Sequence, residues 1–262
     1  MSHQILGPND PPAVSVDTLG INPYLVVCDH ASNRVPASLN QLGLPDDVFG
    51  AHVAYDIGSV SVARRLAGRL GASLVMSAYS RLIIDLNRFP GHPSSIPVVS
   101  DEILIPGNQA LSDDEAQQRE GEFFHPYHNA IAKRLLHMQQ IHSAPTIISV
   151  HTFTPDFAGS KRPWHVGILW GEDGRIARPL IERLARNPEL CVGDNQPYDA
   201  REPIGYTMTV HGARTALPHV LLEIRQDLVA TPYAALQWAD LLYDALIDVF
   251  EQSSTYSSAA MS

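Results

Sequence analysis

The sequence has few cysteines and no basic cluster. Only Cys28 and Cys191 occur among its 262 residues, which excludes a disulfide framework and a zinc site built from several thiolates. No four consecutive residues are Lys or Arg, and the formal net charge is −10. A protein that binds duplex nucleic acid would carry a basic patch, so the composition argues against a nucleic-acid partner.

Export and membrane-insertion signals are also missing from the sequence. The first residues, MSHQILGPNDPPAVSVDTLG, contain neither the basic n-region nor the apolar h-region of a signal peptide. No apolar run approaches the ~18 residues of a membrane span. Because the low cysteine content also suits a reducing compartment, we expect a soluble, cytoplasmic protein with no membrane partner.

The composition is that of a folded domain. Hydrophobic residues make up 45% of the chain, which is enough to bury a large core. No repeat, long linker or shift in composition marks a second domain. We therefore predict one domain over residues 1–262, with its core at about 24–250 and frayed ends.

Short apolar segments rich in β-branched residues alternate with segments of helical periodicity. The predicted strands are 24–29, 73–78, 81–86, 146–152, 165–170 and 219–225. The predicted helices are 56–70, 112–142, 174–186 and 232–251. Continuous apolar strands separated by helices indicate a three-layer α/β domain, with a mixed, mainly parallel sheet and helices on both faces.

Particular residues mark the ends of the predicted helices. Gly71 is the predicted stop of the first helix. Ser112 and Glu115 form a capping box at the start of the second helix, which Pro126 should kink or divide. Thr231 is the predicted N-cap of the last helix.

Three of the predicted strands carry chemically active side chains near their ends. LVVCDHASN leads an apolar strand into His30, IISVHTF leads into His151, and VLLEIRQDL contains Glu223. Because ligands bind outside the carboxyl ends of the strands in such sheets, these three residues could converge on one crevice. Each alone could also be an ordinary structural residue, and Glu223 could pair with Arg225 or Arg201.

Two histidines and a carboxylate form a common ligand set for a mononuclear catalytic zinc ion, which keeps a fourth position open. Asp56, in HVAYDIGS, is the favoured carboxylate, although an Asp here is also a common helix N-cap. His52 and Asn33 are weaker alternatives for the third ligand. In this interpretation His30 binds the metal, while Asp29 orients a ligand or caps the neighbouring loop.

The segment SRLIIDLNR, residues 80–88, places arginines among apolar residues. As a strand it would bring Arg81, Asp85 and Asn87 onto one face. A buried arginine needs a partner, and Asp85 is the candidate within the segment. Alternatively, Arg81 or Arg88 forms a bidentate contact with a substrate carboxylate, for which the planar guanidinium is suited.

Two further histidines are candidates for substrate contact. His128, in FFHPYHNAI, lies on a predicted helix, and His211, in TVHGAR, precedes a glycine turn. His211 could polarise a carbonyl group of the substrate. Either histidine could instead be structural.

Six motifs follow one another along the chain: DHASNRVP, AYDIGS, SRLIIDLNR, FHPYHNAI, SVHTFTP and LPHVLLEIRQDL. Together they resemble the N-formylglutamate amidohydrolase family over roughly residues 24–250. The resemblance implies a phosphorylase/hydrolase-like α/β fold akin to zinc carboxypeptidases and aspartoacylase-like deacylases. It also implies hydrolysis of N-formyl-L-glutamate to formate and L-glutamate, a step of histidine catabolism, or hydrolysis of a related N-acyl amino acid.

The resemblance also assigns roles to individual residues. It implies one Zn2+ ion per chain, or another divalent metal, and the implied ligands are His30, Asp56 and His151. Glu223 is the implied catalytic carboxylate. The residues implied for recognition of an acidic substrate are Arg81, Asn87 and Arg88. Asp56 departs from carboxypeptidase-like sites, in which this ligand is a glutamate.

Other functions have less support. The absence of a G-x-S-x-G elbow and of glycine-rich phosphate-binding motifs argues against serine hydrolases and nucleotide-dependent enzymes. The first alternative is a zinc peptidase or amidase for a peptide or cell-wall substrate, which an open groove would favour. The second is a non-enzymatic binding protein on the same scaffold, and the presence of His30, His151 and Glu223 argues against it.

Overall fold

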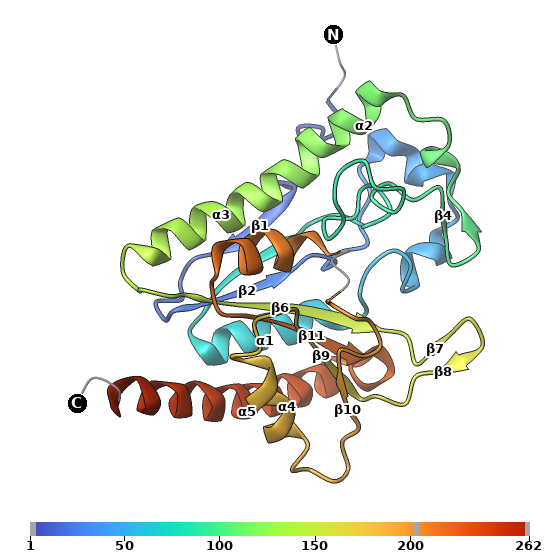
Figure 1. The fold of residues 1–262 in the computed structure, drawn as a ribbon. Coiled ribbons are helices and arrows are strands. Elements are labelled where there is room, and N and C mark those ends of the chain that lie inside the picture. Colours follow the sequence, from blue (N-terminus) through green and yellow to red (C-terminus); the bar gives the residue numbers. More distant parts are fainter. Residues whose placement is uncertain (1–3, 202–204, 260–262) are drawn as a thin grey trace.

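The computed structural model describes residues 4–201 and 205–259. Its centre is a seven-stranded sheet with the strand order β1–β3–β2–β6–β11–β9–β10 (Figure 1). The strands are β1 (Val14–Asp17), β2 (Tyr24–Cys28), β3 (Ser73–Ser77), β6 (Thr146–Phe153), β9 (Val166–Leu169), β10 (Val192–Asp194) and β11 (His219–Arg225). Two short hairpins lie outside this sheet: β4 (Val99–Ser100) with β5 (Ile103–Leu104), and β7 (Asp156–Phe157) with β8 (Ser160–Lys161).

The sheet is mixed and mainly parallel, as predicted. Strands β3, β2, β6 and β11 run parallel to one another. β1 is antiparallel to β3 at one edge. At the other edge, β9 is antiparallel to β11 and parallel to β10.

Helices cover both faces of the sheet, which confirms the three-layer prediction. One face carries α1 (Ser59–Leu70), α4 (Ala177–Leu184) and α5 (Pro232–Ala259), and the other carries α2 (Asp113–Arg119) and α3 (His125–Gln139) (Figure 1). None of the described helices is both long and apolar enough to cross a membrane.

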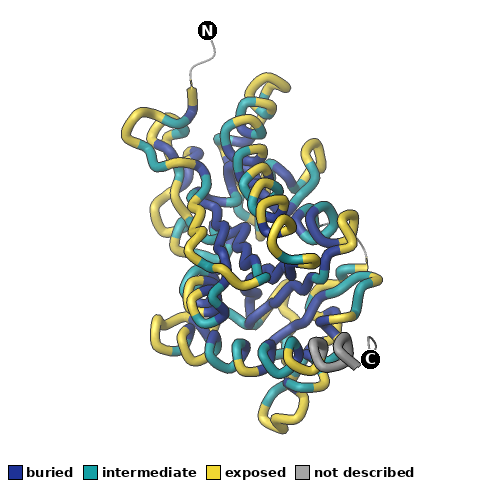
Figure 2. The backbone as a smooth tube through the Cα atoms, turned by 90° about the vertical axis from the view of Figure 1, so that its left-hand side faces the viewer, coloured by how far each residue is buried: buried dark blue, intermediate teal, exposed yellow. Residues whose placement is uncertain are grey.

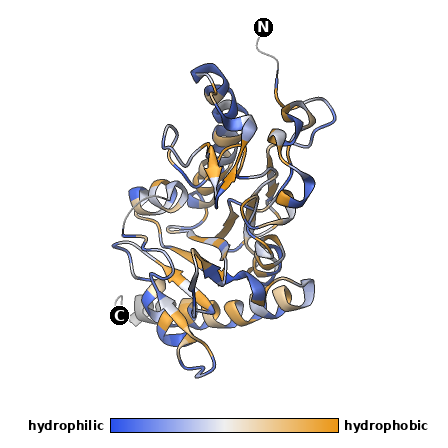
Figure 3. Cartoon of the chain, turned by 90° about the vertical axis from the view of Figure 1, so that its right-hand side faces the viewer, coloured by the Kyte–Doolittle hydropathy of each residue, from blue (hydrophilic) through white to orange (hydrophobic). Residues whose placement is uncertain are grey.

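Alternate residues of each strand fill the two cores between these layers. In β2, Val26 and Cys28 pack on the side of α1 and α5, whereas Leu25 and Val27 pack on the side of α3. This alternation follows from the period of two of an extended chain. Buried residues accordingly run through the centre of the molecule in Figure 2, and Figure 3 shows apolar residues concentrated on the strands.

Most of the predicted helix ends are confirmed. Gly71 follows α1 with a φ of 57°, a left-handed conformation that favours glycine. Ser112 forms the capping box with Glu115, and a π-helical turn joins α2 to α3, which begins beside Pro126. The hydroxyl of Thr231 accepts a hydrogen bond from the backbone of the first turn of α5.

The strand predicted at residues 81–86 is wrong, because this segment forms a series of turns outside the sheet. The backbone N–H of Asp85 donates to the carbonyl of Ser95, and the N–H of Asn87 donates to the Asp85 side chain. Leu82 and Ile84 are buried in the core beneath α3. Their apolar character therefore reflects burial of a turn rather than pairing of a strand.

Other predicted boundaries also need correction. β1 lies in the N-terminal region predicted to be frayed, and its four residues pair with β3. β10 was not predicted, because its three residues include a glycine and an aspartate. α5 continues to Ala259, beyond its predicted end at residue 251.

Candidate active site

The three side chains predicted at strand ends meet at one edge of the sheet. β2 leads into His30, β6 carries His151, and β11 carries Glu223. β6 lies between β2 and β11, and its parallel register with β11 places His151 directly beside Glu223. The carboxyl ends of parallel strands thus form the crevice that the sequence predicts.

Three buried side chains form a group that could hold a metal ion: His30, Asp56 and His151. Their candidate ligand atoms all lie within 4.8 Å of one another. Asp56 Oδ2 is 2.9 Å from His151 Nδ1 and 3.3 Å from His30 Nδ1. Two imidazole nitrogens and one carboxylate oxygen are ligands that zinc accepts.

The outer ring nitrogens of both histidines are held by carboxylates. His30 Nε2 lies 2.8 Å from Asp85 Oδ1, and His151 Nε2 lies 3.1 Å from Asp29 Oδ2. Each ionised carboxylate accepts the Nε2–H, so the Nδ1 atom of a neutral ring would keep its lone pair for a metal ion. Carboxylates commonly orient metal-binding histidines in this way.

Asp29 is itself fixed by two hydroxyl groups. Tyr127 donates to Asp29 Oδ1 over 2.6 Å, and Thr207 donates to the same atom over 3.0 Å. Burial raises the pKa of Asp29, but its contacts with His151 outweigh burial and bring the pKa to about 2. Asp29 therefore stays ionised and orients His151, one of the three candidate ligands.

The charge around the group fits a divalent cation. Three aspartate carboxylates are buried here: Asp29, Asp56 and Asp85. The guanidinium of Arg81 contacts Asp56 and Asp85. Burial lowers the pKa of His151, but its hydrogen bonds to Asp29 and Asp56 outweigh burial and raise it well above its usual value. Buried carboxylates need compensating positive charge, and a divalent ion would supply it while both rings remain neutral.

The alternative roles considered for Asp56 and its rivals do not fit the structure. Gly58, not Asp56, is the N-cap of α1, and the Asp56 carboxylate also accepts the backbone N–H of Thr152. Among the described residues, His52 lies outside the group that could hold a metal. His52 pairs with an aspartate, and Asn33 donates to a backbone carbonyl.

Glu223 lies beside this group in an environment that suits proton transfer. It is 7% exposed, and its Oε2 atom has no hydrogen-bond partner among the described residues. Burial raises the pKa of Glu223 to about 7. The predicted pairs with Arg225 and Arg201 are not formed, because these arginines bind Asp227 and Asp199 instead.

Gly167 of β9 lies opposite Glu223 across the antiparallel pair. A Cβ atom at this position would lie 1.9 Å from the backbone oxygen of Gln196 and 3.4 Å from the Cβ of Glu223. Only glycine therefore lets the segment around Gln196 pass over the strand next to the carboxylate.

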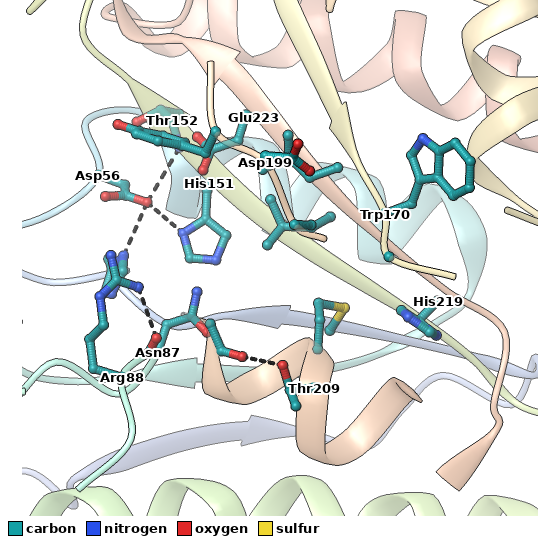
Figure 4. Close-up of a pocket in the computed structure, with 18 of the residues that line it drawn as sticks. Asp56, Asn87, Arg88, His151, Thr152, Trp170, Asp199, Thr209, His219 and Glu223 are labelled. Atoms are coloured by element: carbon teal, nitrogen blue, oxygen red, sulfur yellow. Dashed lines mark hydrogen bonds and ion pairs between the residues drawn. The ribbon is translucent and has the colours of Figure 1, made fainter. Parts of the chain in front are cut away.

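The group and Glu223 line one cavity with a volume of about 540 Å³. Figure 4 shows Asp56, His151 and Glu223 on one side of it, and Trp170 and His219 on the other. The predicted substrate-binding residues Arg81, Asn87 and Arg88 also line this cavity.

Arg81 fits both interpretations made from the sequence. Its Nη2 and Nε atoms donate to Asp85 Oδ2 over 2.6 Å and 3.1 Å, so the internal pair is present. Its side chain nevertheless keeps 26% of its surface exposed at the cavity. Arg88 is held less strongly within the protein, because its Nη1 atom donates to the backbone oxygen of Asn87 over 2.9 Å rather than to a carboxylate.

Comparison with known proteins adds the family. A sequence model described as N-formylglutamate amidohydrolase matches residues 22–230. This chain belongs to the N-formylglutamate amidohydrolase family. It is accordingly an amidohydrolase, and the resemblance of its six motifs is confirmed. No match was found among curated protein sequences.

Two crystal structures are similar to this amidohydrolase. The gene product Atu2144 from Agrobacterium tumefaciens is 30% identical, with a TM-score of 0.90 over 96% of this chain and 100% of that chain. N-formylglutamate amidohydrolase from Ralstonia eutropha JMP134 is 20% identical, with a TM-score of 0.60 over 92% of this chain and 98% of that chain. The second likeness supports the fold.

His128 and His211 are not among the described residues that line the cavity of the amidohydrolase. His128 Nε2 donates to the carbonyl of Leu86 over 2.8 Å, and its Nδ1 lies 3.0 Å from His211 Nε2. The structure thus joins the two histidines to each other, and their contact with a substrate stays a prediction.

Two of the residues that hold the site were missed from the sequence. Tyr127 and Thr207 bind Asp29 across 98 and 178 positions of the chain. Tyr127 lies within the motif FHPYHNAI, where a tyrosine among helix residues gives no indication of its partner. Thr207 lies in a segment with no periodic pattern.

Proposed function

We propose that this amidohydrolase cleaves the amide bond of N-formyl-L-glutamate, or of a related N-acyl amino acid, with Zn2+ held by His30, Asp56 and His151. The observation that carries the proposal is the convergence of these three ligands beside the unpartnered oxygen of Glu223. When bound, the metal would act as a Lewis acid and make water a better nucleophile near neutral pH.

Glu223 is the proposed general base and acid. Its free Oε2 atom can accept a proton from the attacking water and later deliver that proton to the leaving amine nitrogen. Because burial brings its pKa close to neutrality, the carboxyl can both take up and release a proton in the physiological range.

The cationic side of the cavity would recognise the acidic amino acid. Arg81 and Arg88 line the cavity with Asn87, and Arg88 offers donors in the fork geometry that a carboxylate accepts, whereas the Nε and Nη2 atoms of Arg81 also donate to Asp85. The substrate is thus proposed to be a small acidic N-acyl amino acid. A cytoplasmic location and a role in histidine catabolism stay predictions from the sequence.

Formate release from N-formyl-L-glutamate by the purified protein tests the proposal. Activity should disappear after chelation and return with Zn2+. The Glu223→Gln variant should bind the metal and release formate about 10²–10⁴-fold more slowly. Absence of amino-acid release from every N-acyl amino acid tested, with the protein loaded with zinc, would refute the proposal.

A further inference from the structure

The cavity continues well beyond the group that could hold a metal, along the face of β11. His219 and Leu221 line it together with Glu223, whereas Val220 and Leu222 point into the core on the opposite face. Four residues of an extended strand span roughly 13 Å, so the cavity reaches that far from Glu223. Figure 4 shows His219 and Trp170 at the end away from Asp56.

The far part of the cavity, which we name the distal compartment, is mainly apolar. Its residues are Leu169, Trp170, Met208, His219 and Leu221. Leu169 and Leu221 are cross-strand partners on β9 and β11. Among the described residues, these two leucines are buried but belong to neither of the two hydrophobic cores. Their side chains therefore cover the floor of the compartment instead of packing under a helix.

The positive charges of the cavity lie at the other end. Among the described residues that line it, the arginines are Arg81 and Arg88, and no lysine is present. Arg81 contacts Asp56, and Figure 4 places Arg88 on the side of Asp56, away from Trp170. Substrate carboxylates therefore have their partners near the reaction centre.

His219 does not change this distribution. Its Nδ1–H donates to the carbonyl of Leu217 over 2.8 Å, so in the neutral ring its Nε2 atom is an acceptor. Among the described residues of the distal compartment, an acceptor and apolar side chains offer a second carboxylate no charged donor. The compartment suits an uncharged, apolar part of a substrate.

The size of the cavity leads to the same conclusion. Its volume of about 540 Å³ is within the ~300–1,000 Å³ typical of sites for drug-sized ligands, whereas N-formylglutamate has only about a dozen non-hydrogen atoms. With the carboxylates at Arg81 and Arg88, a formyl group would leave the distal compartment without substrate contacts.

We propose that the distal compartment binds the acyl group, and that the preferred substrate is an acidic amino acid carrying an apolar N-acyl chain of several carbons. This inference rests on the proposed amide hydrolysis. The reaction is unchanged: the acyl C–N bond breaks, the hydroxyl of water joins the acyl carbon, and its other proton passes to the amine nitrogen.

A series of N-formyl-, N-acetyl-, N-butanoyl- and N-hexanoyl-L-glutamate tests the proposal. Release of glutamate by the zinc-loaded protein gives kcat/KM for each. Each methylene that enters an apolar site should raise kcat/KM about fourfold, so hexanoyl should exceed formyl by far more than tenfold. Calorimetric titration of Glu223→Gln with the same compounds gives a second readout, in which hexanoyl should bind more tightly than formyl.

Substitutions within the distal compartment locate the acyl chain. Leu221→Trp should fill the compartment and lower the hexanoyl-to-formyl ratio of kcat/KM at least tenfold. Met208→Trp, on a half-buried residue of another wall, should act in the same direction if Leu221→Trp fails to fold. The matched control Leu236→Trp, on the exposed surface of α5, should leave the ratio unchanged.

The outcomes separate this inference from the proposed function. Faster hydrolysis of N-formyl- than of N-hexanoyl-L-glutamate would overturn the inference and leave the proposed function standing. Preference for N-formyl-L-glutamyl-leucine over both would also overturn it, because the compartment would then face the amine side. No release from any of these compounds would refute the proposed function itself.

Discussion

Asp29 and His151 are 122 positions apart in the chain, yet Asp29 Oδ2 accepts the Nε2–H of His151 over 3.1 Å. Asp29 directly follows β2, and His151 lies in the neighbouring parallel strand β6. The contact fixes the tautomer of His151 and aims Nδ1 at Asp56. It also explains why a buried strand leads directly into Asp29 and His30. Asp29 orients the candidate ligand His151, and His30 is itself a candidate ligand.

Asp29→Asn should weaken metal binding while the fold is kept. An amide oxygen can still accept the His151 proton, but the negative charge that strengthens the ligand is lost. Loss of such an outer partner typically costs 10–100-fold in metal affinity, and we expect a loss in this range. Zinc competition with a chromogenic chelator measures it. Asp47→Asn, on an exposed aspartate, is the control, and equal affinities in the two variants would contradict the assignment.

Glu223→Gln should reduce kcat by about 10²–10⁴-fold, the usual contribution of a general base. The amide is nearly isosteric but cannot accept the water proton, so substrate and zinc should still bind. Glu223→Asp keeps the carboxylate and should restore part of the activity. Steady-state kinetics together with calorimetric substrate binding would check this. Unchanged kcat in Glu223→Gln would exclude the general-base role.

Arg88→Ala should raise KM more than it lowers kcat. A hydrogen bond to a charged group contributes roughly 1.5–3 kcal/mol, which corresponds to about 10- to 150-fold in binding. Arg88 is preferable to Arg81 for this test, because Arg81 also pairs with Asp85 and Asp56. Kinetics with an N-acyl glutamate would be compared with those of the exposed-surface variant Arg64→Ala. A KM close to that of the control would show that Arg88 does not bind the substrate.

Removal of the metal should lower thermal stability. Asp29, Asp56 and Asp85 would keep only Arg81 and protonated histidines as compensating charge in the interior. An ion that binds only the folded state stabilises it in proportion to the logarithm of its concentration, so Tm should rise with added Zn2+. Scanning calorimetry with and without chelator measures the shift. His151→Ala should show no such rise.

His128 and His211 should make stability fall in acid. Burial lowers the pKa of each, and the neighbouring imidazole lowers that of His128 further, to about 4 in both cases. Between pH 6.5 and 4 the unfolded chain therefore binds more protons at these residues than the folded protein does. Stability from this source is present above pH 6.5 and falls as the pH decreases toward 4.

The variant His128→Gln isolates this contribution. Between pH 7 and 5 its free energy of unfolding should fall by about 2 kcal/mol less than that of the wild type. Denaturant titrations at the two pH values measure the difference. The exposed His92→Gln is the control and should behave as the wild type does. Equal pH dependence in wild type and His128→Gln would contradict the assignment.

The sequence predicted the parts of the site that depend on regular structure. Each of the three residues lies at or near the carboxyl end of an apolar strand: His30, His151 and Glu223. The carboxyl ends of parallel strands lie at the same edge of a sheet, independently of the other elements of the fold. The convergence of the three residues could be predicted because each of these strands is a continuous apolar run with a titratable residue near its end. Asp56 could be named only as one of several candidates, because a helix N-cap and a metal ligand look the same in the sequence.

The parts that depend on irregular structure could not be predicted in the same way. Residues 81–86 have the apolar content of a strand, but a buried turn requires the same content. Tyr127 and Thr207 reach Asp29 from distant segments, and nothing in their local sequence indicates this contact. The distal compartment exists because one face of β9 and β11 is not covered by a helix. Which face stays uncovered is determined by how the layers pack, and the local sequence does not indicate it.

The position of β11 in the sheet decides when the reaction centre becomes complete. β11 is the last strand of the chain, yet it lies between β6 and β9 and joins the parallel strands to the antiparallel edge. A growing chain would acquire all three candidate metal ligands with β6, and would obtain Glu223 only when β11 is inserted. With the proposed roles of these residues, metal capture would precede hydrolytic competence, and the second would coincide with closure of the sheet.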